Sequence, residues 1–292
     1  MSHYFEVSLK QKGCRDQGSW LTLKASMKKP YLNAVKVLAL LTIVSLSGGV
    51  VFADALPPLP EASLKTDPLS FEGTQWDFQG EEDGIKTWRS QVEGSPLVAW
   101  KGEALIDAPI GKVASVLADT SRKTEWIHKA AKAENVRLIS PLERIEYNRT
   151  ETPPLIMKDR DFVFHAWTEL DRPKKEARIF FLSVEDPLKP EDPNYVRGKL
   201  IKSRYVLTQE EGGAKTRVIV EIHLDPMGSV PKWLVNLFQK SWPFRTLSGI
   251  RKQVAKADVF ENKTVKAFFD GTLKAPPVVT AMDLRTGKVK VD

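Results

Sequence analysis

Cysteine and metal-binding motifs are nearly absent from this 292-residue chain. Its single cysteine, Cys14, lies before the segment that we interpret below as an export signal, so the rest of the chain has no thiol. That part therefore has no disulfide, no Cys-x-x-Cys redox site and no thiolate zinc site. His128, His165 and His223 stand far apart, in no recognised metal-ligand spacing. We expect no metal and no cofactor, and we assign no catalytic residue.

Strong positive charge is also missing from most of the chain. The formal net charge is +7, but seven basic and only two acidic residues fall within residues 1–53. The remainder carries 37 Lys and Arg against 35 Asp and Glu, a balance of +2. A nearly neutral body attracts phosphate backbones weakly, so we expect no nucleic-acid partner.

The apolar run near the front is too short to span a bilayer comfortably. Residues 37–52 form an uncharged run of 16 residues that contains Ser-Gly-Gly, whereas a spanning helix needs about 20 apolar residues. A basic pair precedes the run and small residues follow it, which is typical of a cleaved secretory signal. We interpret residues 27–55 as a signal peptide that is cut after Ala53 or Ala55. This predicts an exported, periplasmic protein.

Two alternatives stay open for this front end. An uncleaved anchor formed by residues 37–52 would hold the protein in the membrane. Residues 1–26 are either an upstream extension or the result of a misassigned start, in which case Met27 is the true first residue. A mature N-terminus near Asp54 or Leu56 would favour cleavage.

The body of the chain has the pattern of an antiparallel sheet. After a Pro-rich linker at residues 56–69, strand patterns begin, and they dominate from 135 to 224 with turn signals between them. Because no long helix interrupts these strands, we expect antiparallel pairing. In the last strand four apolar residues alternate with polar ones, which predicts a sheet with one buried face. They are Val218, Val220, Ile222 and Leu224.

After this strand the hydrophobic period becomes helical. The segment GSVPKWLVNLFQKSWPFRTLSGIRKQVAKADVF has apolar residues at helical spacing, and Pro243 should kink or interrupt the helix. Its apolar stripe includes Trp233, Leu237, Phe238 and Phe244, which we expect to be buried against the apolar face of the sheet. The pattern predicts an α+β fold, a curved antiparallel sheet with one long amphipathic C-terminal helix.

Several segments, in this order, resemble a known family. They are Trp76 with DGIKTWRS, then KGEALIDAPIGKV, TEWIHKA, KDRDFVFHAW, SVEDPLKPEDPNYVRG and LDPMGSVPKWLVNLFQKSWPFRTLSGIRK. The chain resembles the START domain (StAR-related lipid-transfer) family, as a bacterial exported member, over about residues 70–257. Residues 258–292 would be a C-terminal extension. The resemblance implies the helix-grip fold, in which the sheet and the long C-terminal helix enclose a hydrophobic tunnel for one lipid or sterol-like molecule.

This resemblance and the strand alternation give candidates for the tunnel wall. In the strand that contains RDFVFHAW both faces are apolar, so alternation does not decide which face lines the cavity. The wall candidates are Tyr147, Phe162, Phe164, Ala166, Val220, Ile222, Trp233, Leu234, Leu237 and Phe238.

Charged residues at the start of the same strand are interpreted as structural. Arg160 could bridge Asp159 and Asp161 or contact a neighbouring strand. Some family members carry a basic residue in the tunnel six positions after this arginine. Here that position is Ala166, which favours a more apolar ligand.

Other functions remain open at this level. The wider helix-grip superfamily includes cyclases and hydrolases, and Tyr147, Arg149 and His165 could serve such chemistry in the same cavity. An interaction domain with a vestigial tunnel is a third interpretation. We expect a monomer whose partner is a lipid or another hydrophobic molecule. Transient contact with a membrane surface, through basic residues of the last helix, is a further hypothesis, as is hinge motion at residues 225–228 and at Pro243.

Overall fold

The computed structural model describes residues 4–9, 21–26, 71–152, 157–275, 282–283 and 288–289. The chain divides into two compact units, Met1–Pro60 and Glu61–Asp292. In the first unit β1 (Tyr4–Leu9) pairs with β2 (Leu21–Ser26) in an antiparallel hairpin. The predicted signal peptide and linker lie outside the described residues. Within the described part, no helix has the length and apolar character needed to cross a membrane.

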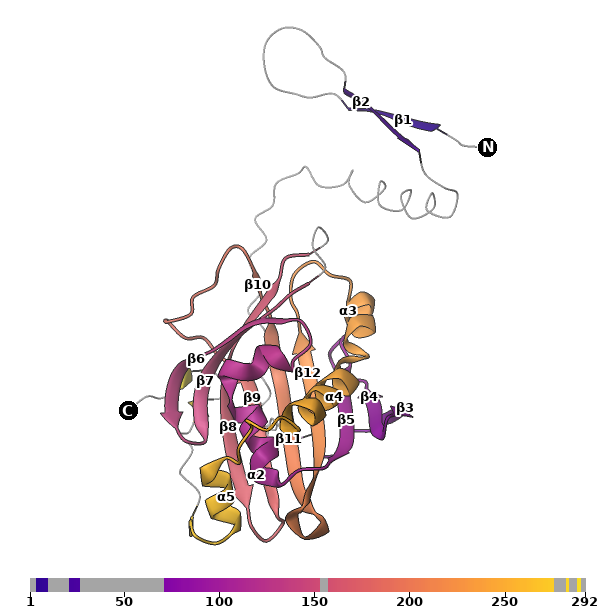
Figure 1. Cartoon of the computed structure of the whole chain (residues 1–292). Helices are drawn as coiled ribbons and strands as arrows, with labels where there is room; N and C mark the ends of the chain where they lie inside the picture. Colours follow the sequence, from indigo (N-terminus) through magenta and orange to yellow (C-terminus); the bar gives the residue numbers. More distant parts are fainter. Residues whose placement is uncertain are drawn as a thin grey trace. The chain divides into compact units, whose positions relative to one another are not determined.

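One ten-stranded sheet forms the body of the second unit (Figure 1). Its order is β3-β4-β5-β12-β11-β9-β8-β7-β6, with neighbouring strands antiparallel as the sequence predicts, and only the short β10 pairs in parallel, with β8. The strands are β3 (Asp77–Glu82), β4 (Ile85–Ser90), β5 (Ala99–Ile106), β6 (Ala130–Ser140), β7 (Glu143–Thr150), β8 (Arg160–Asp171), β9 (Glu176–Ser183), β10 (Val196–Arg197), β11 (Lys199–Glu210) and β12 (Lys215–Asp225).

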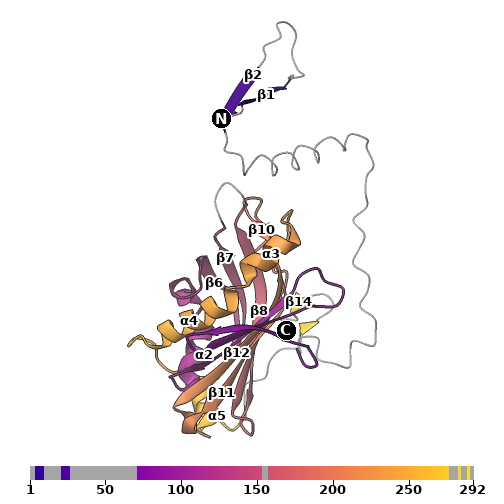
Figure 2. The same ribbon diagram turned by 90° about the vertical axis from the view of Figure 1, so that its right-hand side faces the viewer.

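Helices cover one face of this sheet. In Figure 1 α2 and α4 cross in front of the strands, and Figure 2 shows both on the same side of the sheet. Near the C-terminus, β13 and β14 form a short hairpin. The remaining elements are α2 (Ile110–Ala118), η3 (Thr120–Glu125), η4 (Glu211–Gly213), α3 (Lys232–Gln239), α4 (Trp242–Val254), α5 (Lys263–Phe269), β13 (Met282–Asp283) and β14 (Lys288–Val289), of which η3 and η4 are 3-10 helices.

The single long C-terminal helix expected from the sequence is two helices. The first, α3, ends at Gln239, and the second, α4, begins at Trp242 with Pro243 in its first turn. A proline has no N–H to donate and its ring clashes with the preceding turn, whereas the first turn of a helix tolerates it. The prediction that Pro243 interrupts the helix is therefore confirmed, and the expected helix length is wrong.

The apolar face of the sheet lies beneath α4. On the sheet side Val218, Val220 and Ile222 of β12 are buried, as their alternation predicts, and α4 contributes Leu247 and Ile250 to the same cluster. Each such side chain contributes about 1.5–3 kcal/mol of hydrophobic free energy when buried. The helix lies very close to β5. A Cβ atom added to Gly102 would come within 2.8 Å of Pro243 Cβ and 2.9 Å of Leu247 Cδ1.

Candidate ligand-binding site

The register of β8 decides which of its faces joins the interior. Phe162, Phe164 and Ala166 belong to the large apolar cluster under α4, together with Val220 and Ile222. Aromatic rings extend this wall across the sheet. The Phe181 ring stands edge-on to Phe164, with centroids 5.5 Å apart, and edge-on to Tyr205 at 5.7 Å. Five of the predicted wall residues therefore share one buried apolar surface.

Tyr147 lies on the opposite face of the sheet. It pairs with Val163 of β8 and packs in a separate cluster with Ile145, Val163 and Val184. The sequence analysis named Tyr147 as a candidate for the tunnel wall, and this placement contradicts it. In the structure β7 turns its other face to the interior, so Arg144 and Glu146 lie inside. Tyr147 is therefore not part of the interior wall.

The residues named for the acid/base alternative also lie on this opposite face of the sheet. In the strand register Arg149 lies opposite Asp161, and His165 lies opposite Ile145. Arg149 and His165 therefore share the sheet face of Tyr147. His165 is buried there, with Nε2 2.8 Å from Glu143 Oε1 and its ring stacked on Trp167. Burial lowers the pKa of His165, which favours its neutral form. These three residues therefore lie on the sheet face opposite the aromatic wall.

The exposed face of α3 contradicts the expected burial of its apolar stripe. Trp233 is 69% exposed, Leu237 59% and Phe238 53%, while Leu234 is half-buried and Val235 is the fully buried residue of this helix. Because α3 is a separate helix from α4, the packing of α4 on the sheet does not force the aromatic side of α3 to face the sheet as well. Trp233, Leu237 and Phe238 do not line the interior.

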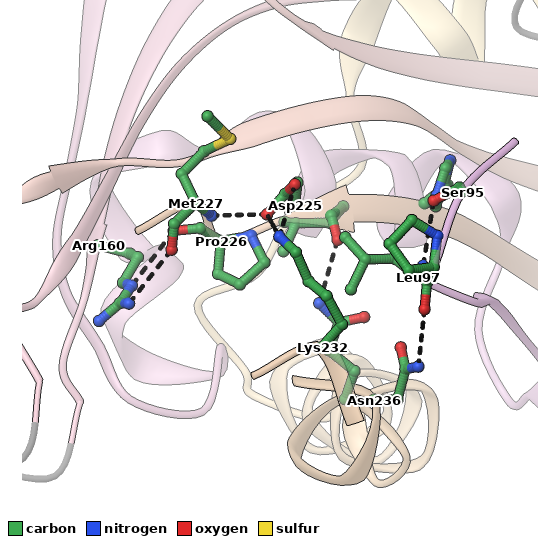
Figure 3. A network of polar contacts seen from close by, with 12 residues as sticks. Ser95, Leu97, Arg160, Asp225, Pro226, Met227, Lys232 and Asn236 are labelled. Atoms are coloured by element: carbon green, nitrogen blue, oxygen red, sulfur yellow. Dashed lines mark hydrogen bonds and ion pairs between the residues drawn. The ribbon is translucent and has the colours of Figure 1, made fainter. Parts of the chain in front are cut away.

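Polar side chains hold α3 to the end of the sheet (Figure 3). Lys232 Nζ lies 3.1 Å from both carboxylate oxygens of Asp225. Asn236 Nδ2 donates to the Pro96 carbonyl at 3.3 Å, and its Oδ1 accepts from the Val98 N–H at 3.2 Å. Few buried apolar contacts and partly exposed polar ones are typical of an element that opens at low free-energy cost.

Arg160 joins the start of β8 to the turn before α3. Its guanidinium donates to the Pro226 carbonyl at 3.3 Å and to the Met227 carbonyl at 3.4 Å (Figure 3). It also donates to the Lys158 carbonyl. It does not bridge the two aspartates. Asp161 instead accepts two hydrogen bonds from Arg197, each 3.0 Å long. Burial lowers the pKa of Arg160, and we find no carboxylate paired with it among the described residues.

A charged cluster that the sequence analysis missed is buried beside the aromatic wall. Lys123 of η3 forms an ion pair with Glu146 of β7, and Arg144 Nε lies 3.0 Å from the other oxygen of that carboxylate. Thr120 donates to the same oxygen at 3.1 Å. Lys123, Arg144 and Glu146 are no more than 6% exposed. We call Thr120, Lys123, Arg144 and Glu146 the interior charged cluster.

The electrostatics of this cluster favour a positive interior. Lys123 Nζ lies 5.7 Å from the Phe164 ring centroid and 5.2 Å from that of Phe181. Burial lowers the pKa of Lys123 to about 8. Burial also acts to raise the pKa of Glu146, but the two neighbouring cations outweigh it and hold that pKa below its ordinary value. With both cations protonated, two positive charges share one carboxylate, so the cluster can accept a further anionic or hydrogen-bond-accepting group.

Two hollows lie beside elements that surround the sheet. A hollow of about 320 Å³ lies beside the β6–β7 turn and Ala118, and one of about 160 Å³ lies beside Ser115 and Gln253. Neither is lined by the wall phenylalanines. Under α4, Leu247 and Ile250 belong to the same buried apolar cluster as the wall residues of the sheet.

An antiparallel sheet with a C-terminal helix packed against one of its faces is the helix-grip fold. The chain belongs to the START domain family, whose family model matches residues 75–256.

Known proteins resemble the chain over the same region. An uncharacterised protein of Pseudomonas aeruginosa is 28% identical over 181 residues, which cover 62% of this chain and 87% of that protein. The phosphatidylcholine transfer protein of Bos taurus is 23% identical over 184 residues, covering 62% and 84%. The crystal structure of a STAR-related lipid transfer protein from Xanthomonas axonopodis has a TM-score of 0.56 at 26% identity, covering 62% of this chain and 99% of that one. Human STARD10 has a TM-score of 0.58 at 20% identity, covering 74% and 87%, and supports the fold alone.

Proposed function

We propose that the protein is a non-enzymatic carrier that binds one lipid or sterol-like molecule between its sheet and α4. The apolar part of the ligand would lie against Phe162, Phe164 and Phe181, where the described chain offers buried aromatic surface. Its polar end would meet the interior charged cluster. The observation that carries the proposal is this cluster, because two buried cations beside a single carboxylate can bind an acceptor group deep in an apolar interior.

The proposed ligand carries an anionic group or an oxygen acceptor. Lys123 and Arg144 are donors without acceptor capacity, and Glu146 already accepts from both and from Thr120. A phosphate, carboxylate or carbonyl would add acceptors where they are scarce. This differs from the preference for a more apolar ligand that Ala166 suggests.

Loading would begin at α3. Its exposed Trp233, Leu237 and Phe238 lie beside Lys232 and Lys240, a combination that suits the interface of an anionic membrane. Insertion of this face would compete with the polar contacts that hold α3 to Asp225 and Pro96. We infer that the contact with the membrane is transient and that residues 225–228 and Pro243 are the hinge points.

Native mass spectrometry with lipid extraction tests the carrier function. The expected result is one lipid per chain, released with its mass unchanged, and weaker retention in the Lys123→Met/Arg144→Met double variant. The matched control is Lys129→Met, an exposed residue just beyond η3. Conversion of the bound molecule would support an enzyme instead. A chain that stays empty after incubation with phospholipid vesicles would favour an interaction domain and contradict the proposal.

Export completes the proposed function. We infer that the chain acts in the periplasm after removal of residues 27–55, with the anchored form as the alternative. Mass determination of the N-terminus from fractionated cells tests this. A first residue at Asp54 or Leu56 supports cleavage, and an intact segment 37–52 in the membrane fraction contradicts it.

A further inference from the structure

Two hydroxyl groups on β11 have no part in the binding described so far. In the strand register Ser203 lies opposite Ile222 of β12, and Tyr205 lies opposite Val220. Directly opposite residues of an antiparallel pair share one face of the sheet. Because Val220 and Ile222 belong to the large apolar cluster under α4, both hydroxyl side chains lie on the face that carries the aromatic wall.

Both residues are buried within this wall. Ser203 is 4% exposed and Tyr205 7%. The Phe181 ring stands edge-on to Tyr205, with centroids 5.7 Å apart, and Phe181 lies opposite Ser203 in the ladder between β9 and β11. Because β11 lies in the middle of the sheet, between β12 and β9, the surface that these side chains keep faces the helix side and not a sheet edge (Figure 1).

Neither hydroxyl has a hydrogen-bond partner among the described residues. Each hydroxyl oxygen nevertheless keeps some accessible surface, in contrast to the shielded indole Nε1 atoms of Trp100 and Trp126. A donor in an apolar interior gains free energy when an acceptor reaches it. Ser203 and Tyr205 therefore offer two hydrogen-bond donors to a molecule that lies between the sheet and α4.

Both donors are uncharged. Burial raises the pKa of Tyr205, and the negative charge of Glu146 raises it further, so the hydroxyl keeps its proton at neutral pH. A hydroxyl can donate one hydrogen bond without bringing a charge. The interior charged cluster already supplies two cations for an anionic group. A neutral oxygen acceptor, such as a carbonyl, is therefore the group that suits Ser203 and Tyr205.

We propose that Ser203 and Tyr205 select an acyl lipid by donating hydrogen bonds to its ester or amide carbonyls, while its anionic group lies at the interior charged cluster. This inference rests on the carrier function proposed above. Residues two apart on a strand are separated by about 7 Å, so a ligand with two carbonyl groups can meet both donors. A ligand without carbonyls leaves both donors without an acceptor, and a site of this kind discriminates strongly against it.

The test is competition between two lipids in mixed vesicles, read by native mass spectrometry of the full chain. The lipids are dipalmitoyl phosphatidylglycerol and its dihexadecyl ether analogue, which has the same phosphate and the same chains but no carbonyl. At about tenfold for each hydrogen bond, the wild type should prefer the ester by about a hundredfold. Tyr205→Phe and Ser203→Ala should each lower this preference about tenfold, and the double variant should abolish it. The matched control is Tyr195→Phe, which removes a hydroxyl that accepts from Arg149, and it should keep the preference of the wild type.

The outcomes separate this inference from the carrier function. Equal retention of the two lipids by the wild type, or an unchanged preference in the double variant, would overturn the role of the hydroxyls and leave the carrier function standing. Retention of neither lipid would overturn both. Urea unfolding of the lipid-free chain adds a second readout. Tyr205→Phe should not lower the free energy of unfolding, because no hydrogen bond within the protein is lost. A clear loss of stability would show that the hydroxyl serves the fold and not the ligand.

Discussion

Arg144 of β7 lies directly opposite Ala166 of β8 in the antiparallel ladder. Ala166 occupies the position at which some family members carry a basic residue, and its small side chain had suggested an uncharged interior. The neighbouring strand instead supplies the guanidinium, and η3 adds the Lys123 ammonium. The charge of the interior therefore depends on a cross-strand pairing that a residue-by-residue comparison along β8 does not reveal.

Removing Glu146 should destabilise the fold strongly. In Glu146→Gln, Lys123 and Arg144 lose the carboxylate that both contact while they stay buried. Breaking a buried ion pair from one side typically costs about 3–5 kcal/mol, and we expect the free energy of unfolding to fall by a similar amount. Urea unfolding at pH 7 measures it. Lys123→Met leaves the Arg144–Glu146 pair intact and should cost clearly less; an equal or larger loss would show that the carboxylate is not the centre of the cluster.

The lowered pKa of Lys123 predicts a rise of stability in mild alkali. The folded chain gives up this proton near pH 8, whereas the unfolded chain holds it until about pH 10.5. In that window the unfolded state binds more protons, so the free energy of unfolding increases with pH. From pH 8 to pH 10 the gain relative to Lys123→Met should be about 2 kcal/mol. Urea unfolding across this range measures it, and parallel curves for the two proteins would contradict the assignment.

Much of the fold could be predicted from the sequence because strand alternation and the helical period are local signals. The buried β12 stripe and the break at Pro243 follow from them. The interior charged cluster does not, since Arg144 and Glu146 alternate with apolar residues in the way that solvent-facing charges do. Only the register with Phe164 and Ala166 places them inside. The exposure of the apolar side of α3 could not be predicted for a related reason. A helical stripe of apolar residues does not reveal which surface it will pack against.

Loss of the Arg160 side chain should loosen α3. Arg160→Met removes the donors to the Pro226 and Met227 carbonyls and leaves these partly exposed acceptors to water. Hydrogen exchange of residues 226–239 should become faster by about tenfold, a change of about 1.4 kcal/mol in the opening equilibrium. Exchange in β11, measured in the same experiment, should not change. Arg160→Lys restores one donor and should give an intermediate rate. Uniform acceleration across the sheet would instead indicate global destabilisation.

Replacing Gly102 should move α4. Gly102→Ala adds a Cβ that would lie 2.8 Å from Pro243 Cβ and 2.9 Å from Leu247 Cδ1, closer than packed atoms approach. Overpacking of this kind costs about 1–3 kcal/mol, measured as a loss in the free energy of unfolding. If α4 relieves the clash by lifting from β5, lipid uptake from vesicles should become faster in this variant. A destabilised protein with unchanged uptake would place the entry route elsewhere than beneath α4.

Substitutions on the exposed aromatic face of α3 should weaken membrane binding without destabilising the fold. Trp233→Ser and Phe238→Ser remove side chains that are mostly in solvent, so each should change the free energy of unfolding by no more than about 0.5 kcal/mol. Binding to vesicles with anionic lipids should nevertheless weaken by about tenfold, because the apolar anchors are lost. Leu138→Ser is the matched control, since Leu138 is 75% exposed on the β6–β7 hairpin. Equal losses in Leu138→Ser and Trp233→Ser would show that exposed apolar area alone, and not the face of α3, drives adsorption.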